Sequence, residues 1–331
     1  NGEIIQRKGT HKRTNGKSEL KLIQGLNDEK FRLLYMEYDI PTPENSRHTK
    51  ARFGLGCEVN IINGTPIVLD NYNPQIKLFA LHSSENTYTI NCDEDLLKLA
   101  NAVNVDDSKI GSDLEFTQTC DIDMDYICYK INKNYGWNPI GANNNTPFKA
   151  TYNGNNHKIT GLTIDRPNTY GVGLFGYTSM AYIKNVHITN SEIRGDYATG
   201  SLVGVITRPG NIKASTVIDC CRVSNSTIER STFSSDDDGV NIGGLVGVIE
   251  EGSSLNLTTS SSTDNTIKAT YNAGGLVGGS VSHTVAYIGN CTSENNNITA
   301  QISGAGGIIA VADTVKETSA VAVSEFKKIG I

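Results

Sequence analysis

Pairs of apolar residues held between small residues recur along the second half of this 331-residue chain. The copies of this first element are Gly173–Gly176, Ser201–Gly204, Gly244–Gly247, Gly275–Gly278 and Gly307–Ala310. A second element starts with an aliphatic residue at Ile159, Ile183, Ile218, Leu257 and Ile288. The starting positions are 24, 35, 39 and 31 residues apart, yet the internal pattern is constant. This combination indicates one repeated structural unit with loops of varying length.

Two further positions keep their chemistry from copy to copy. Seven residues after each of the last four starting positions stands Asn190, Asn225, Asp264 or Asn295. Ten residues after them stands Ile193, Ile228, Ile267 or Ile298. Short polar side chains tolerate left-handed backbone, so the Asn and Asp residues predict a corner of the unit. The glycines of the first element predict a sharp bend at another corner. Residue parity does not decide whether Leu245 or Val246 faces inward.

The repeat predicts an all-β fold, a parallel β-helix, over residues 89–331. Each strand would bond to the equivalent strand of the next coil, about 4.8 Å away, so that inward side chains stack in columns. One coil alone cannot bury these side chains, and several must stack. The shortest spacing suits three strands and three turns, which predicts a three-sided coil. The general preference of crossover connections predicts right-handed winding.

The seven cysteines form no CxxC pair, which argues against a disulfide framework and a zinc site. Cys221 and Cys291 fall in the slot that Val186 and Leu162 occupy in other copies, so we expect buried free thiols. The two thiols would lie two coils apart, roughly 10 Å by the strand spacing. This exceeds the ~7 Å limit between Cα atoms for a disulfide. A pair between Cys120 and Cys128 stays open.

Residues 1–88 lack the repeat. Short alternating runs separated by turn formers, among them Pro41, Pro43 and Asn63-Gly64, predict a small antiparallel, sandwich-like β module. A short helix is expected at 93–103, with Asn91 as its cap and Glu94 closing a capping box. It is well placed to cover the open end of the β-helix.

Charge and hydropathy narrow the choice of partner. The net charge of −6 disfavours nucleic acid and anionic membrane surfaces as partners. The sequence has no apolar run near the ~20 residues of a membrane span and no recognisable signal peptide. The first residue is Asn1 rather than Met, which fits a processed product.

The repeats Gly244–Gly247, Gly275–Gly278 and Gly173–Gly176 resemble the GLUG motif. The stretch from Asp121 to Leu162, with Trp137-Asn-Pro-Ile-Gly141, strengthens the resemblance. GLUG-type β-helices occur in bacterial cell-surface adhesion proteins of Bacteroidetes and in non-catalytic repeats of IgA1-specific metallopeptidases. The resemblance covers about 90–331. It implies a β-helical surface protein and names no ligand.

Motifs for several enzyme classes are missing from the sequence. The six histidines include no pair one helical turn apart beside a glutamate, so a zinc peptidase is not expected. A GxSxG nucleophile elbow and a GxxxxGK[ST] phosphate loop are also missing. We therefore expect no enzyme activity, no catalytic, cofactor-binding or metal-ligating residue, and no cofactor.

A polysaccharide lyase or hydrolase is the main enzymatic alternative, because converging carboxylates would suffice for it. Asp121, Asp123 and Asp125 alternate at strand spacing, and Asp236–Asp238 are adjacent in a Ser- and Gly-rich loop. We interpret both sets as solvated, with weak calcium binding by the second set left open.

Other candidate side chains have plain structural interpretations. His157, His187 and His283 are expected to be separate surface or turn residues. Trp137 is expected to pack in the first coil, although with Tyr135 it would also serve as a sugar-stacking platform.

These observations favour a non-enzymatic adhesion, binding or stalk module at the cell surface. Its partner would be a host or cell-surface protein or glycan, bound by the longest loops, Thr207–Gly210 and Ser231–Gly239. The expected location is extracellular, with an outer-membrane anchor on a removed N-terminal segment left open. The alternatives are a carbohydrate-active enzyme and an accessory region of a larger processed polypeptide.

Overall fold

The computed structural model divides the chain into two compact units, Asn1–Lys77 and Leu78–Ile331. It describes residues 9–14, 17–22, 30–39, 50–62, 65–68, 82–84, 86–105, 110–131, 134–208, 214–231, 240–311, 315–318 and 321–328. Side chains are described for 86–105, 110–129, 134–208, 215–231 and 240–311.

The strands of the first unit pair antiparallel. β1 (Gly9–Thr14) pairs with β2 (Lys17–Leu22), and β4 (Lys50–Ile62) pairs with both β3 (Lys30–Asp39) and β5 (Thr65–Val68). A sandwich-like arrangement of residues 1–88 stays a prediction.

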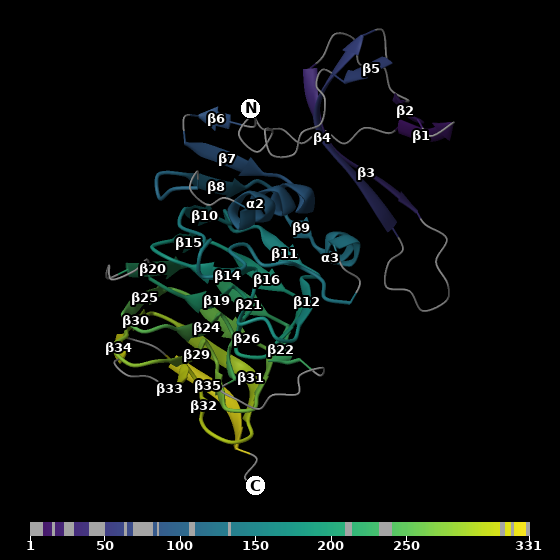
Figure 1. Cartoon of the computed structure of the whole chain (residues 1–331). Coiled ribbons are helices and arrows are strands. Elements are labelled where there is room, and N and C mark those ends of the chain that lie inside the picture. The colour runs from purple at the N-terminus through teal and green to yellow at the C-terminus, as the bar shows by residue number, and fades with distance from the viewer. Residues whose placement is uncertain are drawn as a thin grey trace. The chain divides into compact units, whose positions relative to one another are not determined.

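The second unit consists of short strands that stack coil upon coil in parallel sheets, apart from one antiparallel pair at its start (Figure 1). The first sheet runs in the order β34 (Val315–Thr318), β30 (Val285–Gly289), β25 (Ser253–Thr258), β20 (Ala214–Asp219), β15 (Tyr182–Lys184), β10 (Thr151–Asn153), β8 (Glu115–Gln118), β7 (Thr87–Ile90) and β6 (His82–Ser84). The second contains β12 (Thr163–Arg166), β17 (Glu192–Gly195), β22 (Thr227–Arg230), β27 (Thr266–Ala269), β31 (Thr292–Ala300), β26 (Ser261–Thr263), β21 (Arg222–Ser224), β16 (His187–Thr189), β11 (Lys158–Thr160) and β9 (Ile122–Asp123), with β35 (Val321–Lys328) beside β31.

Two smaller parallel sheets complete the coils. One contains β13 (Gly171–Val172), β18 (Ala198–Gly200), β23 (Asn241–Gly243), β28 (Asn272–Gly274) and β32 (Ala305–Gly306). The other contains β14 (Phe175–Thr178), β19 (Val203–Ile206), β24 (Val246–Ile249), β29 (Val277–Ser280) and β33 (Ile309–Val311). These sheets confirm the predicted all-β fold with parallel stacked coils. The sequence-based boundary after residue 88 falls inside β7, whose residues pair with β8.

The register confirms four of the five predicted starting positions and corrects the first. Ile183, Ile218, Leu257 and Ile288 stack one above another. The residue beneath Ile183 is Tyr152, 31 positions earlier, whereas Ile159 pairs with Ile188. Leu162 therefore does not share the slot of Val186, and the spacing of 24 residues is not a coil. The aromatic ring of Tyr152 replaces an aliphatic side chain at this position, which hid the first copy.

The predicted corner is present in every expected coil. Asn190, Asn225, Asp264 and Asn295 have φ values of 51°, 49°, 57° and 54°. A second left-handed corner, which the sequence did not reveal, is formed by Asn185, Cys220, Thr259 and Asn290. Side chains that follow the first corner form a buried polar ladder, in which the Ser226 amide donates to Asn265 Oδ1 and the Asn265 amide donates to Asn296 Oδ1. This ladder satisfies amides at the bend, where the sheet pattern is interrupted.

The glycines of the first element are required by close approach of neighbouring coils. A Cβ built on Gly244 would overlap the carbonyl oxygen of Gly275, and one on Gly247 would lie 2.5 Å from the amide nitrogen of Thr199. The expected reason, a bend that needs glycine's backbone freedom, is therefore replaced by packing distance. Leu245 and Val246 are both fully buried, because the chain turns between β23 and β24.

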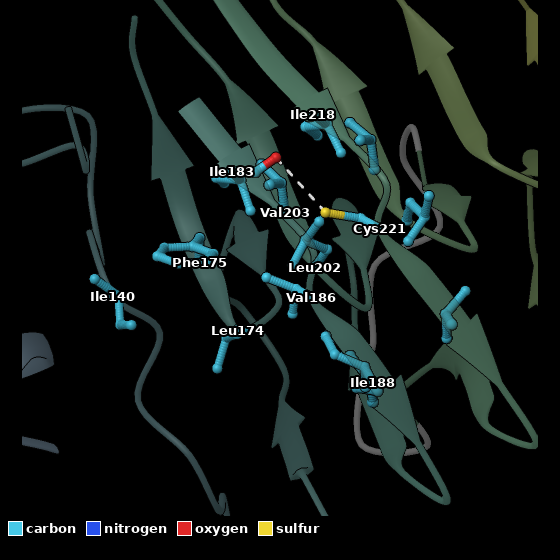
Figure 2. Close-up of a cluster of buried hydrophobic side chains, with 14 of the residues drawn as sticks. Ile140, Leu174, Phe175, Ile183, Val186, Ile188, Leu202, Val203, Ile218 and Cys221 are labelled. Carbon is cyan, nitrogen blue, oxygen red and sulfur yellow. Dashed lines mark hydrogen bonds between the residues drawn. The ribbon is translucent and has the colours of Figure 1, made fainter. Parts of the chain in front are cut away.

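The main core is one large cluster of side chains that the coils share (Figure 2), and a smaller cluster consists of Tyr177, Ala198, Val205 and Val248. Val186, Cys221 and Cys291 form one buried column, with Ser260 between the two cysteines. Each buried aliphatic side chain contributes ~1.5–3 kcal/mol relative to exposure. The predicted buried free thiols are confirmed for Cys221 and Cys291, and the six cysteines whose side chains are described are all free.

The helix α2 (Asp93–Val105) packs Leu96, Leu99, Ala100 and Val103 into the same core cluster. Asp95 closes its cap in place of the predicted Glu94, because its Oδ2 accepts hydrogen bonds from both the amide and the side chain of Asn91.

The end of α2 is held by Asn104, whose Oδ1 accepts from the amides of Gly141 and Ala142. A second helix, α3 (Asp125–Ile131), follows β9. Among the described residues, no helix has the length and hydropathy needed to cross a bilayer.

Candidate functional site

The three aspartates near the start of the coils hold the backbone in place. Asp121 precedes β9 and Asp123 ends it, and both are exposed, whereas Asp125 begins α3, so the predicted strand alternation does not extend to the third aspartate. Asp121 Oδ1 accepts a hydrogen bond from the Lys158 amide at 2.9 Å, and Asp123 Oδ1 accepts from the Asp125 amide at 3.0 Å. The second bond caps the first turn of α3.

Asp123 and Asp125 converge on one glycine. A Cβ built on Gly161 would lie 2.9 Å from Asp125 Oδ1 and 3.2 Å from Asp123 Oδ1. Gly161 also has a φ of +66°, so this corner favours glycine twice over. The two carboxylates thus lie close to the backbone of a residue that has no side chain. Asp236–Asp238 and most of the loop Ser231–Gly239 lie outside the described residues.

Trp137 is a core residue, as its structural interpretation predicted. Its side chain is fully buried and Nε1 donates to the Leu174 carbonyl at 3.1 Å. Tyr135 is 44% exposed, so the two rings do not form a shared exposed platform. The loop beginning at Thr207 is described only to Arg208, and the Thr207 hydroxyl donates to Asn144 Oδ1 at 2.8 Å.

The partly exposed ring of Tyr170 stacks with two other tyrosine rings, one of which, Tyr177, is buried. The ring of Tyr170 lies 5.7 Å from that of Tyr197 and 6.4 Å from that of Tyr177, with interplanar angles of 15° and 24°. Tyr170 is 44% exposed, so part of its side chain remains accessible to solvent. These ring contacts stabilise the packing of neighbouring coils.

The three candidate histidines are separate from one another, as expected, but one of them belongs to a larger arrangement. His157 Nδ1 lies 3.4 Å from Asp121 Oδ1, and the exposed His283 lies 3.5 Å from Glu251 Oε1. His187 lies on β16, directly between Lys158 on β11 and Arg222 on β21 in the parallel register. We refer to Lys158, His187 and Arg222 as the basic column.

Two positions further along the same strands lies a second column, this one of hydroxyl groups. Its members are Thr160, Thr189, Ser224 and Thr263. His187 Nε2 is 3.0 Å from Ser224 Oγ, and Ser224 donates to Thr189 Oγ1 at 3.0 Å. Because Ser224 uses its proton toward Thr189, it accepts the hydrogen bond of His187 Nε2–H.

An open depression of about 400 Å³ continues from the basic column toward the C-terminal coils. Its lining includes His187, Arg222, Ser224, Ser261, Thr263 and Thr292. Burial lowers the pKa of His187, and the neighbouring charges of Lys158 and Arg222 lower it further, against an opposing effect of Asp121. Lys158 and Arg222 are thus close enough to His187 to disfavour its protonated form, in addition to the larger effect of burial.

No protein-family profile matches the chain. Halomucin of Haloquadratum walsbyi is 34% identical over 116 residues, which are 34% of this chain and 1% of halomucin. A "Putative Gly-rich membrane protein" of Evansella cellulosilytica is 37% identical over 89 residues, which are 26% of this chain and 10% of that protein. The chain thus spans a tenth or less of either relative.

A solved structure provides the comparison of fold. The crystal structure of a "putative immunoglobulin A1 protease" from Bacteroides ovatus matches 72% of this chain and 67% of that one, with a TM-score of 0.52 and 19% sequence identity. The shared property is the fold. The resemblance to immunoglobulin A1 protease-type proteins, expected from the repeats, is confirmed at that level.

Proposed function

We propose that this chain is a non-enzymatic binding or stalk module displayed outside a bacterial cell. The proposal includes the finer features expected from the sequence, namely GLUG-type repeats wound into a right-handed, three-sided β-helix. Its partner would be a protein or glycan of a host or of a cell surface.

One observation carries the proposal. Successive coils repeat the same register, so outward-facing residues of sequence-distant strands form straight columns such as Lys158, His187 and Arg222. A regular ladder of this kind presents a long, rigid surface whose chemistry is set strand by strand, and solenoids commonly use such surfaces for binding. Similarity of fold to the Bacteroides ovatus protein supports the architecture.

The contacts of the aspartates support a binding role in preference to catalysis. Asp121 and Asp123 each accept a backbone hydrogen bond, which ties their carboxylates to the framework of the first coils.

Two assays on the intact chain test the proposal. A screen against arrays of glycans and extracellular matrix proteins should detect a saturable ligand, or, for a pure stalk, none. Incubation with pooled polysaccharides should release no new reducing ends or unsaturated products. Turnover of any polysaccharide that survives repurification of the protein would contradict the proposal.

A carbohydrate-active enzyme is the second candidate, favoured by the convergence of Asp123 and Asp125 on Gly161. Paired carboxylates are what glycoside hydrolysis requires. If this candidate is right, Asp123→Ala abolishes turnover while thermal unfolding shifts only by the loss of one helix cap. Asp165→Ala is the matched control. It likewise removes a hydrogen-bonded carboxylate, because Asp165 Oδ1 accepts from Ser231 Oγ at 2.6 Å.

A further inference from the structure

The basic column concentrates positive charge on an acidic chain. The chain carries a net charge of −6, yet Lys158, His187 and Arg222 follow one another in three adjacent strands. The parallel register puts their Cα atoms about 4.8 Å apart from strand to strand. Lys158 and Arg222 are exposed, and within the described ranges neither head group has an ion-pair partner. Because His187 stands between them and is neutral near pH 7, the charges of Lys158 and Arg222 lie two strand spacings apart and form no stabilising cross-strand pair with each other.

A different column of the same sheet shows how this chain arranges charges when they serve only stability. Arg194 on β17 pairs with Glu229 on β22 at 2.9 Å, and Glu229 pairs with Lys268 on β27 at 3.6 Å. Positive and negative charges therefore alternate along that column. The basic column lacks this alternation until Asp121, which lies beside His157 and Lys158 at its N-terminal end.

The depression beside the basic column is lined by groups that suit a polyhydroxylated ligand. Ser261, Thr263 and Thr292 contribute hydroxyls, and Asn290 contributes an amide at the adjacent left-handed corner. Hydroxyls both donate and accept hydrogen bonds, and lysine and arginine donate charge-assisted bonds to sulfate and carboxylate oxygens. Arg222 thus lines the depression together with these hydroxyls, and Lys158 lies two strands away along the basic column.

We propose that the basic column and the adjoining depression bind an acidic oligosaccharide, a sugar chain that carries sulfate or carboxylate groups. The inference rests on the proposed binding function and names the chemical class of its ligand. Lys158 and Arg222 bind the acidic groups, while Ser261, Thr263 and Thr292 bind sugar hydroxyls in the depression.

The charge of the site argues against a nucleic acid as its ligand. Duplex DNA presents one phosphate charge per ~1.7 Å and is usually held by many basic residues. Here three basic residues stand on a chain of net charge −6, and Asp121 closes one end of the column. A ligand with sparse acidic groups and many hydroxyls fits this distribution better.

The test measures binding to the full chain by isothermal titration calorimetry. The probe is a sulfated dextran hexasaccharide, and unsulfated dextran of the same length and inorganic sulfate serve as ligand controls. Saturable binding of the sulfated sugar is expected, with affinity that falls as salt rises. Both controls should bind at least tenfold more weakly, because each lacks one of the two kinds of contact.

Substitutions locate the site. Lys158→Gln and Arg222→Gln should each weaken binding about tenfold, in line with the loss of one charge-assisted hydrogen bond. Lys268→Gln removes the same charge from a side chain of the Glu229 column that is 52% exposed, and should leave the affinity unchanged. Equal losses in all three variants would mean that only net charge matters and would overturn the site.

The protonation of His187 gives an independent test of whether the acidic ligand binds at the basic column. Since burial and its neighbours Lys158 and Arg222 lower its pKa, His187 is neutral near pH 7, and a bound anion should raise that pKa. Affinity should therefore increase as the pH falls toward the pKa of His187, and His187→Gln should remove this increase. Titration of the imidazole signals by NMR, with and without the probe, measures the pKa directly. An unchanged His187 pKa at saturation would place the ligand elsewhere.

The outcomes separate this inference from the proposed function. No binding of the sulfated sugar, or equal binding of unsulfated dextran, overturns the acidic ligand. Equal affinity for a 12-base-pair DNA duplex overturns the carbohydrate. In each case a ligand from the glycan and matrix-protein screen would leave the proposed binding function intact, whereas polysaccharide turnover would overturn that function itself.

Discussion

At the scale of single residues, the corners of the coils depend on side chains that accept left-handed backbone. Asn225, with a φ of 49°, is one of four such residues in one column. The sequence revealed this column because Asn or Asp fills every position. The second corner was missed, because Asn185, Cys220, Thr259 and Asn290 share a backbone conformation and no side-chain chemistry.

Asn225 tests the role of the corner. Asn225→Ala should lower the free energy of unfolding by about 1 kcal/mol, because a Cβ without a locally bonding polar group is disfavoured in this region. Asn225→Gly should cost less than the alanine variant, since glycine adopts positive φ freely. Urea unfolding followed by circular dichroism measures both, and Asn297→Ala, at an exposed position of β31, is the control. Equal stability of the alanine and glycine variants would show that φ does not limit this corner.

Adjacent cysteines provide a second test at this scale. Cys221 is fully buried, with Sγ 3.3 Å from the Asp219 carbonyl oxygen, and burial raises its pKa to about 12. Cys220 sits on the corner and is partly exposed, although burial and Asp219 also raise its pKa.

Iodoacetamide at pH 8 should therefore label Cys220 at least tenfold faster than Cys221 in the folded protein, because only Cys220 is accessible. Fragmentation mass spectrometry assigns the label to each residue. In 6 M guanidinium, a concentration on the order of that which unfolds even hyperstable domains, the two rates should converge. Rapid labelling of Cys221 under native conditions would contradict its place in the core column.

At the scale of elements, the spacing between coils depends on glycine. The predicted bend explained these residues by backbone freedom, whereas the structure explains them by backbone atoms of neighbouring coils that leave no space for a Cβ. The sequence cannot distinguish the two reasons, because both require the missing side chain. Register decides between them, and register is visible only once the coils are stacked.

Gly244→Ala tests the close approach. Its methyl group would overlap the Gly275 carbonyl oxygen, so neighbouring coils must separate, and we expect a loss of about 3 kcal/mol in the free energy of unfolding. Gly111→Ala is the matched control, since its Cβ would meet only the movable carboxylate of Asp113, and should stay within ~0.5 kcal/mol of the wild type. A Gly244→Ala variant as stable as the control would contradict the role of coil spacing.

The same dependence on register explains why the candidate site was not found in the sequence. His187, Arg222, Ser261 and Thr292 all lie four positions after a starting residue, so the repeat contained the signal. Lys158 is different, because it lies six positions after Tyr152, the residue that stacks on Ile183, and not four. The first coil therefore has two extra residues between these strands, and no fixed spacing in the sequence placed the lysine beside His187.

At the scale of the whole second unit, stability is shared between neighbouring coils. Each buried column links a coil to the one before and the one after, and the helix α2 packs its apolar face into the same cluster. Contacts of this kind act between nearest neighbours, so a local defect should weaken adjacent coils most.

Ile228 tests how far such a defect spreads, because it is fully buried between Ile193 on β17 and Ile267 on β27. Ile228→Ala should cost ~2–5 kcal/mol. In hydrogen exchange with mass spectrometry, peptides that contain β17, β22 and β27 should lose most protection, while those containing β8 and β10 should change little. Thr227→Ala, on the same strand with a partly exposed side chain, should leave the pattern unchanged. Equal loss of protection from β8 to β31 would instead show that the coils unfold as one cooperative unit. In that case the strands of the basic column could not unfold locally without the rest.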